Sequence, residues 1–411
     1  MPTIGSSPSP SHPGTATGAA RPRVGVVSHT PFWLFDHGRE LGRRGWDVSL
    51  YTATPRRMIH PAVASRIHVK LGWATSSQAL RRLARFGLYL PGPWFWAMER
   101  RARAELARWA APRLDGIALL DALSTWGAEL GPLVQRMGGR HVCNRGSSHI
   151  LFQRDLLTEE FARWSCPPPD GFPDWLVQRE LAEYASADAI AVPSTFVRRT
   201  FEGRGVPAAR VHVTPYGVDL TRFRPQPGAD RRFRVLFVGS ASVRKGIGYL
   251  LEAVRPLVLR GRAELWLVGA VSTEARAVLA RHGDIVTMKG FVPPDQLAAT
   301  YSQGSVLVLP SIEEGLARVQ AQAMACGLPV IATPNTGAED LFDDGREGFI
   351  VPIRDPRAIR DRLEWMLAHP DAGRAMGEAA RHRIGARSGW GAYGDAVERL
   401  YGRLLDGRSA A

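Results

Sequence analysis

Short runs of apolar residues alternate with longer segments of mixed polarity along the chain from Arg23 onward. Most runs are apolar at every position, which is typical of parallel strands buried on both faces. The pattern predicts thirteen strands, over residues 23–30, 47–53, 66–72, 116–123, 141–147, 189–195, 211–217, 233–239, 263–269, 285–290, 305–311, 329–335 and 348–352. Between them, helices are predicted over residues 38–45, 97–110, 176–186, 246–260, 294–303, 317–326 and 388–405.

Repeated strand–helix–strand order predicts an α/β fold, and thirteen strands exceed what one compact sheet usually holds. A Pro- and charge-rich segment at 219–232 divides the runs and predicts a linker. We therefore expect two Rossmann-like, doubly wound parallel-sheet domains that face an interdomain cleft. Their expected limits are a disordered tail over residues 1–21, an N-terminal domain over 22–218, a C-terminal domain over 219–387, and a helix over 388–411 that packs back towards the N-terminal domain.

Composition narrows the class of protein. Hydrophobic residues make up 45% of the 411, which excludes a chain that is disordered throughout. Cys143, Cys166 and Cys326 are widely spaced, which argues against a disulfide framework or structural zinc site and suits a cytoplasmic protein. The longest strongly apolar stretch without charge, residues 86–98, contains two prolines and is shorter than the about 18 residues of a membrane span.

The chain is strongly basic, with 53 Lys and Arg against 39 Asp and Glu and a net charge of +14. Residues 21–218 contain 27 basic and 17 acidic residues, so most of the excess lies in the N-terminal half. Such an excess, which is almost wholly arginine, suits an anionic partner or simply reflects a GC-rich genome, and composition leaves both open. No recognition helix, zinc site or aromatic RNA platform accompanies the charge, so we expect no nucleic-acid partner.

The most informative segment lies between residues 306 and 352. An apolar strand ends at Ser311, two carboxylates follow, Gly315 permits a tight backbone, and a helix begins near Ala317. The first N–H groups of a helix lack partners within it and lie at the positive end of its dipole, so phosphate binds there readily. A glutamate at this mouth also suits a simple helix cap, so Glu314 alone leaves both roles open.

A second segment, residues 235–253, presents adjacent cations after a strand that ends at Gly239. Arg244 and Lys245 at a strand–turn–helix transition suit a diphosphate, because they offer one planar fork and one compact ammonium. The alternative, in which both cations are simply solvated, is disfavoured because a positive charge is unfavourable beside the positive end of a helix dipole. The segment matches neither the phosphate loop of nucleotide triphosphatases nor the Gly-x-Gly-x-x-Gly fingerprint, so neither that hydrolysis nor NAD binding is indicated.

Together these segments resemble the family-4 glycosyltransferases, retaining enzymes of the GT-B fold that use nucleotide sugars. The resemblance extends over about residues 23–405 and rests on five ordered motifs: EYASADAIAVPS (183–194), TPYGVDLTRFRP (214–225), FVGSASVRKGIGYLLEA (237–253), KGFVPPDQLAATYSQGSVLVLPSIEEG (289–315) and AMACGLPVIATPNTGAEDL (323–341). It implies a hexosyltransferase that takes a UDP- or GDP-linked sugar and works without a metal ion or other cofactor.

The resemblance implies roles for individual residues. Arg244 and Lys245 would neutralise the donor diphosphate, although the family usually has an arginine where this chain has Ser240. Glu314 fits the first glutamate of the family's Glu–seven residues–Glu signature, which contacts sugar hydroxyls. The second, ribose-binding position is occupied by Gln322, which can accept a hydrogen bond but lacks the charge. Further positions implied at the donor are Gly239, Phe291, Val292, Gly315, Leu316, Ala317, Arg318 and Glu339.

The N-terminal half, which holds the acceptor in this family, departs further from the family pattern. Phe32, Trp33 and Phe35 stand where many members have paired glycines, so the acceptor class stays open between glycan, lipid and small molecule. His149 follows a strand end, at a site comparable to a family histidine near the transferred sugar, and a structural histidine is the alternative. No enzyme nucleophile is evident, which suits a mechanism in which the leaving diphosphate accepts the acceptor's proton.

Residues 80–109 form a basic–aromatic stretch that suits the surface of an anionic membrane. We therefore expect a cytoplasmic protein that can attach peripherally, and a core-packed helical hairpin with a solvated basic face is the alternative. The residues that suggest attachment are Arg81, Arg82, Arg85, Arg100, Arg101, Arg103, Trp94, Phe95 and Trp96.

Two other functions fit the same motifs. One is a GT-B nucleotide-sugar epimerase or hydrolase, which would use the same donor site. The other is a catalytically degenerate nucleotide-sugar-binding protein, which the glutamine at position 322 suggests.

Overall fold

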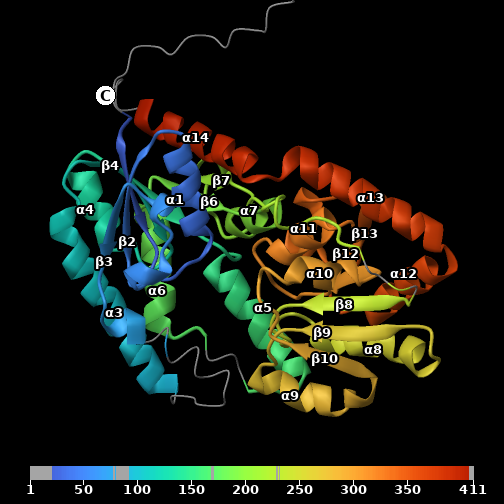
Figure 1. Ribbon diagram of the computed structural model, residues 1–411. Helices are drawn as coiled ribbons and strands as arrows, with labels where there is room; N and C mark the ends of the chain where they lie inside the picture. The colour runs from blue at the N-terminus through green and yellow to red at the C-terminus, as the bar shows by residue number, and fades with distance from the viewer. Residues whose placement is uncertain are drawn as a thin grey trace, which may run out of the picture.

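Two parallel sheets form the centre of the molecule, as the computed structural model shows for residues 21–76, 79, 92–167, 171–227, 230 and 232–406 (Figure 1). The N-terminal sheet consists of β1 (Arg23–Val27), β2 (Asp47–Thr52), β3 (Arg66–Val69), β4 (Ile117–Leu123), β5 (Arg140–Asn144), β6 (Ala189–Val192) and β7 (Val211–Val213). The C-terminal sheet consists of β8 (Arg234–Val238), β9 (Glu264–Val268), β10 (Val286–Gly290), β11 (Val306–Leu309), β12 (Val330–Ala332) and β13 (Gly348–Ile350). These two sheets of seven and six strands confirm the predicted α/β fold class.

Both sheets reverse their strand order beside their first strand. The orders are β3–β2–β1–β4–β5–β6–β7 and β10–β9–β8–β11–β12–β13, so β1 pairs with β2 and β4, and β8 pairs with β9 and β11. Loops that leave the carboxyl ends of such neighbouring strands diverge to opposite faces and open a crevice, where α/β sheets bind ligands. The loops after β8 and β11 carry Arg244, Lys245, Glu314 and Gly315.

Helices cover both sheets (Figure 1). Every predicted helix is present with shifted ends: α1 (Trp33–Arg43), α3 (Gly92–Ala110), α6 (Asp174–Ser186), α8 (Ile247–Leu259), α10 (Leu297–Ser302), α11 (Arg318–Ala325) and α14 (Trp390–Asp406). The sequence pattern missed α4 (Leu130–Arg136), α5 (Ile150–Arg163), α7 (Thr195–Glu202), α9 (Thr273–Ala280), α12 (Pro356–Ala368) and α13 (Pro370–Arg387).

The C-terminal helix α14 lies beside α1, on the N-terminal sheet (Figure 1). The hydroxyls of Tyr393 and Tyr401 are 3.0 and 3.1 Å from the two ring nitrogens of buried His37. The Tyr401 hydroxyl also donates to Asp121 of β4 (2.8 Å). The chain thus crosses to the second sheet after β7 and returns to the first through α14.

Two expectations concern the membrane and the tail. Within the described ranges, none of the helices combines the length and the apolar character that crossing a bilayer requires. The predicted disordered tail lies outside the described residues, apart from its last position.

Candidate functional site

The loop that follows β8 carries both predicted cations and depends on two glycines. Gly239 has φ +132° and Gly246 has φ +67°, conformations that other residues rarely adopt. A Cβ on Gly246 would lie 2.0 Å from the carbonyl oxygen of Pro310, so the loop packs directly on the segment that follows β11. The backbone N–H of Lys245 donates to the Ser242 hydroxyl (3.2 Å), which fixes the turn just before α8.

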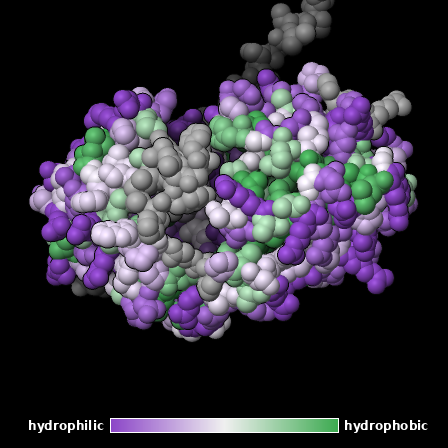
Figure 2. Space-filling view, turned by 90° about the horizontal axis from the view of Figure 1, so that it is seen from below, coloured by the Kyte–Doolittle hydropathy of each residue, from purple (hydrophilic) through white to green (hydrophobic). Residues whose placement is uncertain are grey.

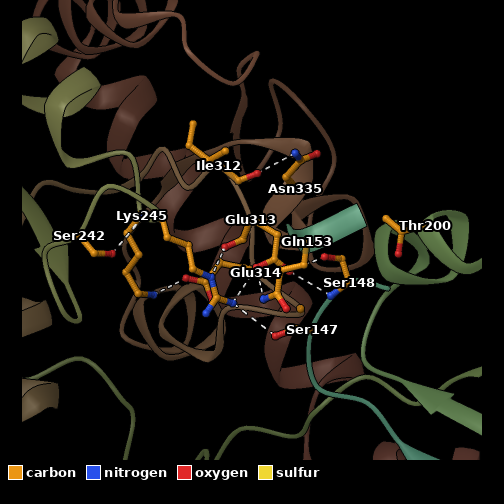
Figure 3. Close-up of polar contacts among 12 residues, drawn as sticks. Ser147, Ser148, Gln153, Thr200, Ser242, Lys245, Ile312, Glu313, Glu314 and Asn335 are labelled. Carbon is orange, nitrogen blue, oxygen red and sulfur yellow. Dashed lines mark hydrogen bonds and ion pairs between the residues drawn. The ribbon is translucent and has the colours of Figure 1, made fainter. Parts of the chain in front are cut away.

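The loop between β11 and α11 presents Glu314. Its backbone N–H donates to the Asn335 carbonyl (3.0 Å), and the Asn335 side chain donates to the Ile312 carbonyl (2.8 Å). The N-cap residue of α11 is Ala317, and this helix has no side-chain cap. The Glu314 carboxylate instead accepts a hydrogen bond from Nζ of Lys245, 69 positions earlier in the chain (Figure 3).

Arg244 joins this ion pair from the same loop. Its guanidinium forms an ion pair with Glu313 (2.8 Å), and its Nε donates to the Glu313 carbonyl (3.1 Å). Burial alone would lower the pKa of Arg244, but the Glu313 and Glu314 carboxylates outweigh burial and raise the pKa, so the side chain stays charged. The structure thus brings together Arg244, Lys245 and Glu314, three of the four residues predicted to be catalytic.

Glu313 is a member of the site that the sequence reasoning missed. Its fully buried carboxylate accepts hydrogen bonds from the Ser148 amide (3.0 Å), the Ser148 hydroxyl (2.6 Å) and Nε2 of Gln153 (2.8 Å). Burial alone would raise the pKa of Glu313, but Arg244 and these donors outweigh it and hold the pKa below its usual range. The adjacent carboxylates of Glu313 and Glu314 therefore contact different partners, and no local sequence pattern predicts which of the two pairs with Lys245.

The backbones of the two domains touch beside Glu314. A Cβ on Gly315 would lie 1.9 Å from the Gly146 carbonyl oxygen, and the Ser194 hydroxyl donates to the Gly315 carbonyl (2.7 Å). Arg145, next to Gly146, forms an ion pair with buried Glu180 (2.7 Å). Arg145 was also missed, and the signal that could have found it is a basic residue beside a glycine at the end of an apolar strand.

A cavity of about 1020 Å³ lies between the domains and is lined by residues of both. Arg318 and Gln322 line it from α11, and Phe32 and Asp36 line it from the N-terminal side. Arg318 and Asp36 are 3.7 Å apart across the cavity, and burial raises the pKa of Asp36. The side-chain oxygen of Gln322 accepts a hydrogen bond from the Tyr301 hydroxyl (3.0 Å). Arg318 and Gln322, both predicted to bind the donor, therefore form part of the cavity wall.

The other predicted donor residues differ in how exposed they are. Leu316 and Ala317 are buried in the loop that leads to α11. Phe291 lies just beyond β10 and is 68% exposed. Glu339 forms an ion pair with Arg199 of α7 (2.8 Å), so its carboxylate contacts the N-terminal domain.

The structure does not bring His149 into the cluster. His149 is the N-cap of α5, and its Nδ1 accepts a hydrogen bond from the Leu151 amide (3.3 Å). The ring is 3% exposed and packs against Phe201 and Tyr184, with ring centroids 5.0 and 5.2 Å away. Burial lowers the pKa of His149 to about 4, so the ring is neutral at pH 7. Its role near the transferred sugar stays a prediction.

The charge at the site comes from side chains on both domains. Arg145, Arg244 and Lys245 supply the cations, and each is paired with a carboxylate. Where the chain is described, no three His, Cys, Asp or Glu residues are grouped so that they could hold a metal ion.

Two sequence families match the chain, one for each sheet. Residues 30–222 match the family described as Glycosyltransferase Family 4, and residues 232–369 match the family described as Glycosyl transferases group 1. The two matches follow one another in chain order and together include the loops described above.

Three known proteins illustrate the similarity. The putative colanic acid biosynthesis glycosyltransferase WcaL of Escherichia coli K12 is 30% identical over 39% of this chain and 42% of its own. The alpha-D-kanosaminyltransferase of Streptomyces kanamyceticus is 29% identical over 77% of this chain and 83% of its own. The solved structure of sucrose-phosphate synthase from Thermosynechococcus elongatus has a TM-score of 0.72 and 22% identity, covering 94% of this chain and 100% of that chain.

The extent of these matches differs between relatives. The chain spans about half the length of the first two curated relatives, 42% of one and 55% of the other. The similarity in fold covers nearly the whole molecule, with both sheets included. The two family matches and the shared two-sheet GT-B fold show that the chain belongs to the family 4, or group 1, glycosyltransferases.

Proposed function

We propose that this chain transfers a hexose from a UDP- or GDP-linked sugar to a hydroxyl of a glycan, lipid or small-molecule acceptor, with retention of the anomeric configuration. The observation that carries the proposal is the meeting of Lys245 and Glu314 at the point where the strand order of the C-terminal sheet reverses. The two residues come from different loops and lie beside the contact between the domains. Membership of the glycosyltransferase family supports the same reaction.

Each side chain at the site suits one part of such a donor. Lys245 and Arg244 neutralise the charge that develops on the diphosphate as its bond to sugar C1 breaks. Once the diphosphate engages Lys245, the Glu314 carboxylate is available to accept hydrogen bonds from sugar hydroxyls. Gln322, on the cavity wall, can accept one hydrogen bond from a ribose hydroxyl.

The proposed reaction needs no nucleophile from the protein. The acceptor oxygen bonds to C1 on the face that the diphosphate leaves, which retains the configuration. The acceptor's proton passes to an oxygen of the leaving diphosphate. The protein holds the sugar, the diphosphate and the acceptor in place and stabilises the charge on the leaving diphosphate. A site built from cations and a carboxylate suits this task.

A panel of UDP- and GDP-sugars tested by thermal shift is expected to include at least one that raises Tm. A ligand present at about 100 times its Kd stabilises the folded state by ~2.7 kcal/mol. Product analysis with the hit and a mixture of acceptors then separates the alternatives. Free sugar from donor alone indicates a hydrolase, an altered sugar an epimerase, and binding without turnover a non-catalytic protein. If no nucleotide sugar binds, the proposal is wrong.

For the acceptor side, we propose that α3 attaches the N-terminal domain to an anionic membrane. Trp94 is 73% exposed, and Arg100 and Arg101 are exposed on the same helix. Arg103, by contrast, is buried and paired with Glu99 (2.8 Å), so it belongs to the packed face of α3. Arg81, Arg82 and Arg85 lie outside the described residues. In Figure 2, the coloured surface on the left, N-terminal side of the view is mostly hydrophilic, with a few small hydrophobic patches, and the larger hydrophobic patches lie on the right.

Sedimentation with vesicles tests this attachment. At low salt, the protein is expected to sediment with phosphatidylglycerol-containing vesicles and not with phosphatidylcholine alone. Replacing Arg100 and Arg101 with glutamine should weaken binding by ~1 kcal/mol each, about fivefold, because each arginine near an anionic surface contributes that much. The matched control replaces Arg357 and Arg374, which are 84% and 70% exposed on the other domain. Equal loss in both double variants, or no binding at low salt, contradicts the proposal.

A further inference from the structure

Glu313 is a fully buried carboxylate for which the proposed reaction has no use. It stands next to Glu314 in the chain, but its side chain points away from Lys245, towards the N-terminal domain (Figure 3). An ionised carboxylate out of water is costly unless charge and hydrogen bonds compensate it. At Glu313 this compensation comes from groups on both domains.

The partners of Glu313 divide between the two domains. Ser148 donates its N–H (3.0 Å) and its hydroxyl (2.6 Å), and Gln153 donates from Nε2 (2.8 Å). These donors lie 165 and 160 positions away, in the segment that enters α5. On its own domain, Glu313 holds the Arg244 guanidinium at 2.8 Å. One carboxylate therefore connects the N-terminal domain to a cation proposed to bind the diphosphate.

Arg244 is held on three sides. Besides its ion pair with the Glu313 carboxylate, it donates to the Glu313 carbonyl (3.1 Å) and approaches the Ser147 hydroxyl (3.4 Å). Its side chain nevertheless remains 36% exposed, so one side is open to a ligand. If residues 147–153 separate from the C-terminal domain, Glu313 loses three hydrogen-bond donors and Arg244 loses its contact with Ser147.

We propose that Glu313 is a positioning residue that makes the orientation of Arg244 depend on contact between the two domains. The donor site then has its full set of oriented cations only when the N-terminal domain, with its acceptor, is in place. This inference rests on the proposed function, because it assigns Arg244 to the donor diphosphate.

The test measures kcat and donor KM for Glu313→Gln, Ser148→Ala and Arg244→Met, with the nucleotide sugar found in the thermal-shift panel. Glu313→Gln keeps the shape but removes the charge that holds Arg244, and we expect kcat to fall on the order of 10²-fold, as misplaced groups do. Ser148→Ala leaves the ion pair and removes one hydrogen bond to a charged group, so kcat should fall by about tenfold. Donor KM should change less than kcat in both.

A double-mutant cycle separates positioning from a general loss of structure. If Glu313 acts through Arg244, the variant that carries both Glu313→Gln and Arg244→Met is expected to be no slower than Arg244→Met alone. Additive losses would overturn the proposal, as would unchanged kcat in Glu313→Gln. If Glu313→Gln fails to fold, the same cycle with Ser148→Ala decides the question.

The matched control is Glu159→Gln. Like Glu313, Glu159 makes a contact between the domains: it lies on α5 of the N-terminal domain and forms an ion pair with Arg354 (2.9 Å). Unlike Glu313, it is 51% exposed, and its ion-pair partners are Arg354 and Arg163 rather than Arg244. Its kcat should stay within twofold of wild type. A wild-type protein that neither binds nor turns over nucleotide sugars removes the proposed function and this inference with it. An active wild type with unaffected Glu313→Gln and Ser148→Ala variants removes only the inference.

Discussion

Lys245→Ala and Glu314→Ala are each expected to abolish sugar transfer while leaving the fold intact. Lys245 supplies a cation at the proposed diphosphate position, and removing one such preorganised group typically lowers kcat by about 10²–10³-fold. Glu314→Ala removes the carboxylate proposed to hold the sugar and leaves Lys245 without its ion-pair partner. The measurement is steady-state transfer with a nucleotide sugar, alongside far-UV circular dichroism and Tm to establish folding.

Lys70→Ala is the matched control for the lysine. Lys70 is one of only three lysines in the chain and pairs with Glu105 (3.3 Å) on the N-terminal domain. As a partly exposed ion pair it contributes little to stability, so activity should remain close to wild type. A Lys245→Ala/Glu314→Ala double variant with full activity would falsify the assignment of the site.

Gly315→Ala is expected to lower kcat/KM for transfer more than about 10²-fold, because it pushes the domains apart at the site. The added Cβ would lie 1.9 Å from the Gly146 carbonyl oxygen and 3.1 Å from Pro193 Cγ. No side chain meets backbone oxygen at 1.9 Å, so one backbone must move, at a cost of about 1–3 kcal/mol for overpacking. The movement separates Glu314 and its neighbours from the acceptor-bearing domain.

The measurement for Gly315→Ala is kcat/KM together with calorimetric affinity for the free nucleotide diphosphate. Its matched control is Gly385→Ala on α13, where a Cβ would meet nothing within 4 Å, so activity should not change. Wild-type turnover by Gly315→Ala would show that this contact between the domains is not part of the active arrangement.

Local patterns in the sequence predicted the strands and the part of the site that the C-terminal domain contributes. Buried parallel strands are apolar at every position, so all thirteen runs were visible, and the loops after them were visible as interruptions with Gly, Pro and charge. Lys245 and Glu314 follow such strands, and parallel strands bring their carboxyl ends to one edge, so their meeting could be expected. The resemblance to family-4 glycosyltransferases then assigned the chemistry.

The same patterns failed for helices whose apolar stripe is short or interrupted. Helix α5 was missed because its sequence, ILFQRDLLTEEFAR, mixes buried polar residues with apolar ones, including Gln153 and Glu160. These polar residues are buried because they bond across the domains: Gln153 to Glu313 (2.8 Å) and Glu160 to Arg354 (2.6 Å). An interface between domains is more polar than a core, and a hydrophobic pattern does not detect it.

The sequence by itself determined the number and type of strands and the loops that hold Arg244, Lys245 and Glu314, because these depend on residues close together in the chain. Only the tertiary structure decided that Glu313 turns to Ser148 while Glu314 turns to Lys245, and that Gly315 touches Gly146. Those contacts join residues up to 169 positions apart, and their geometry depends on how two separately formed sheets pack. No short-range periodicity contains that information.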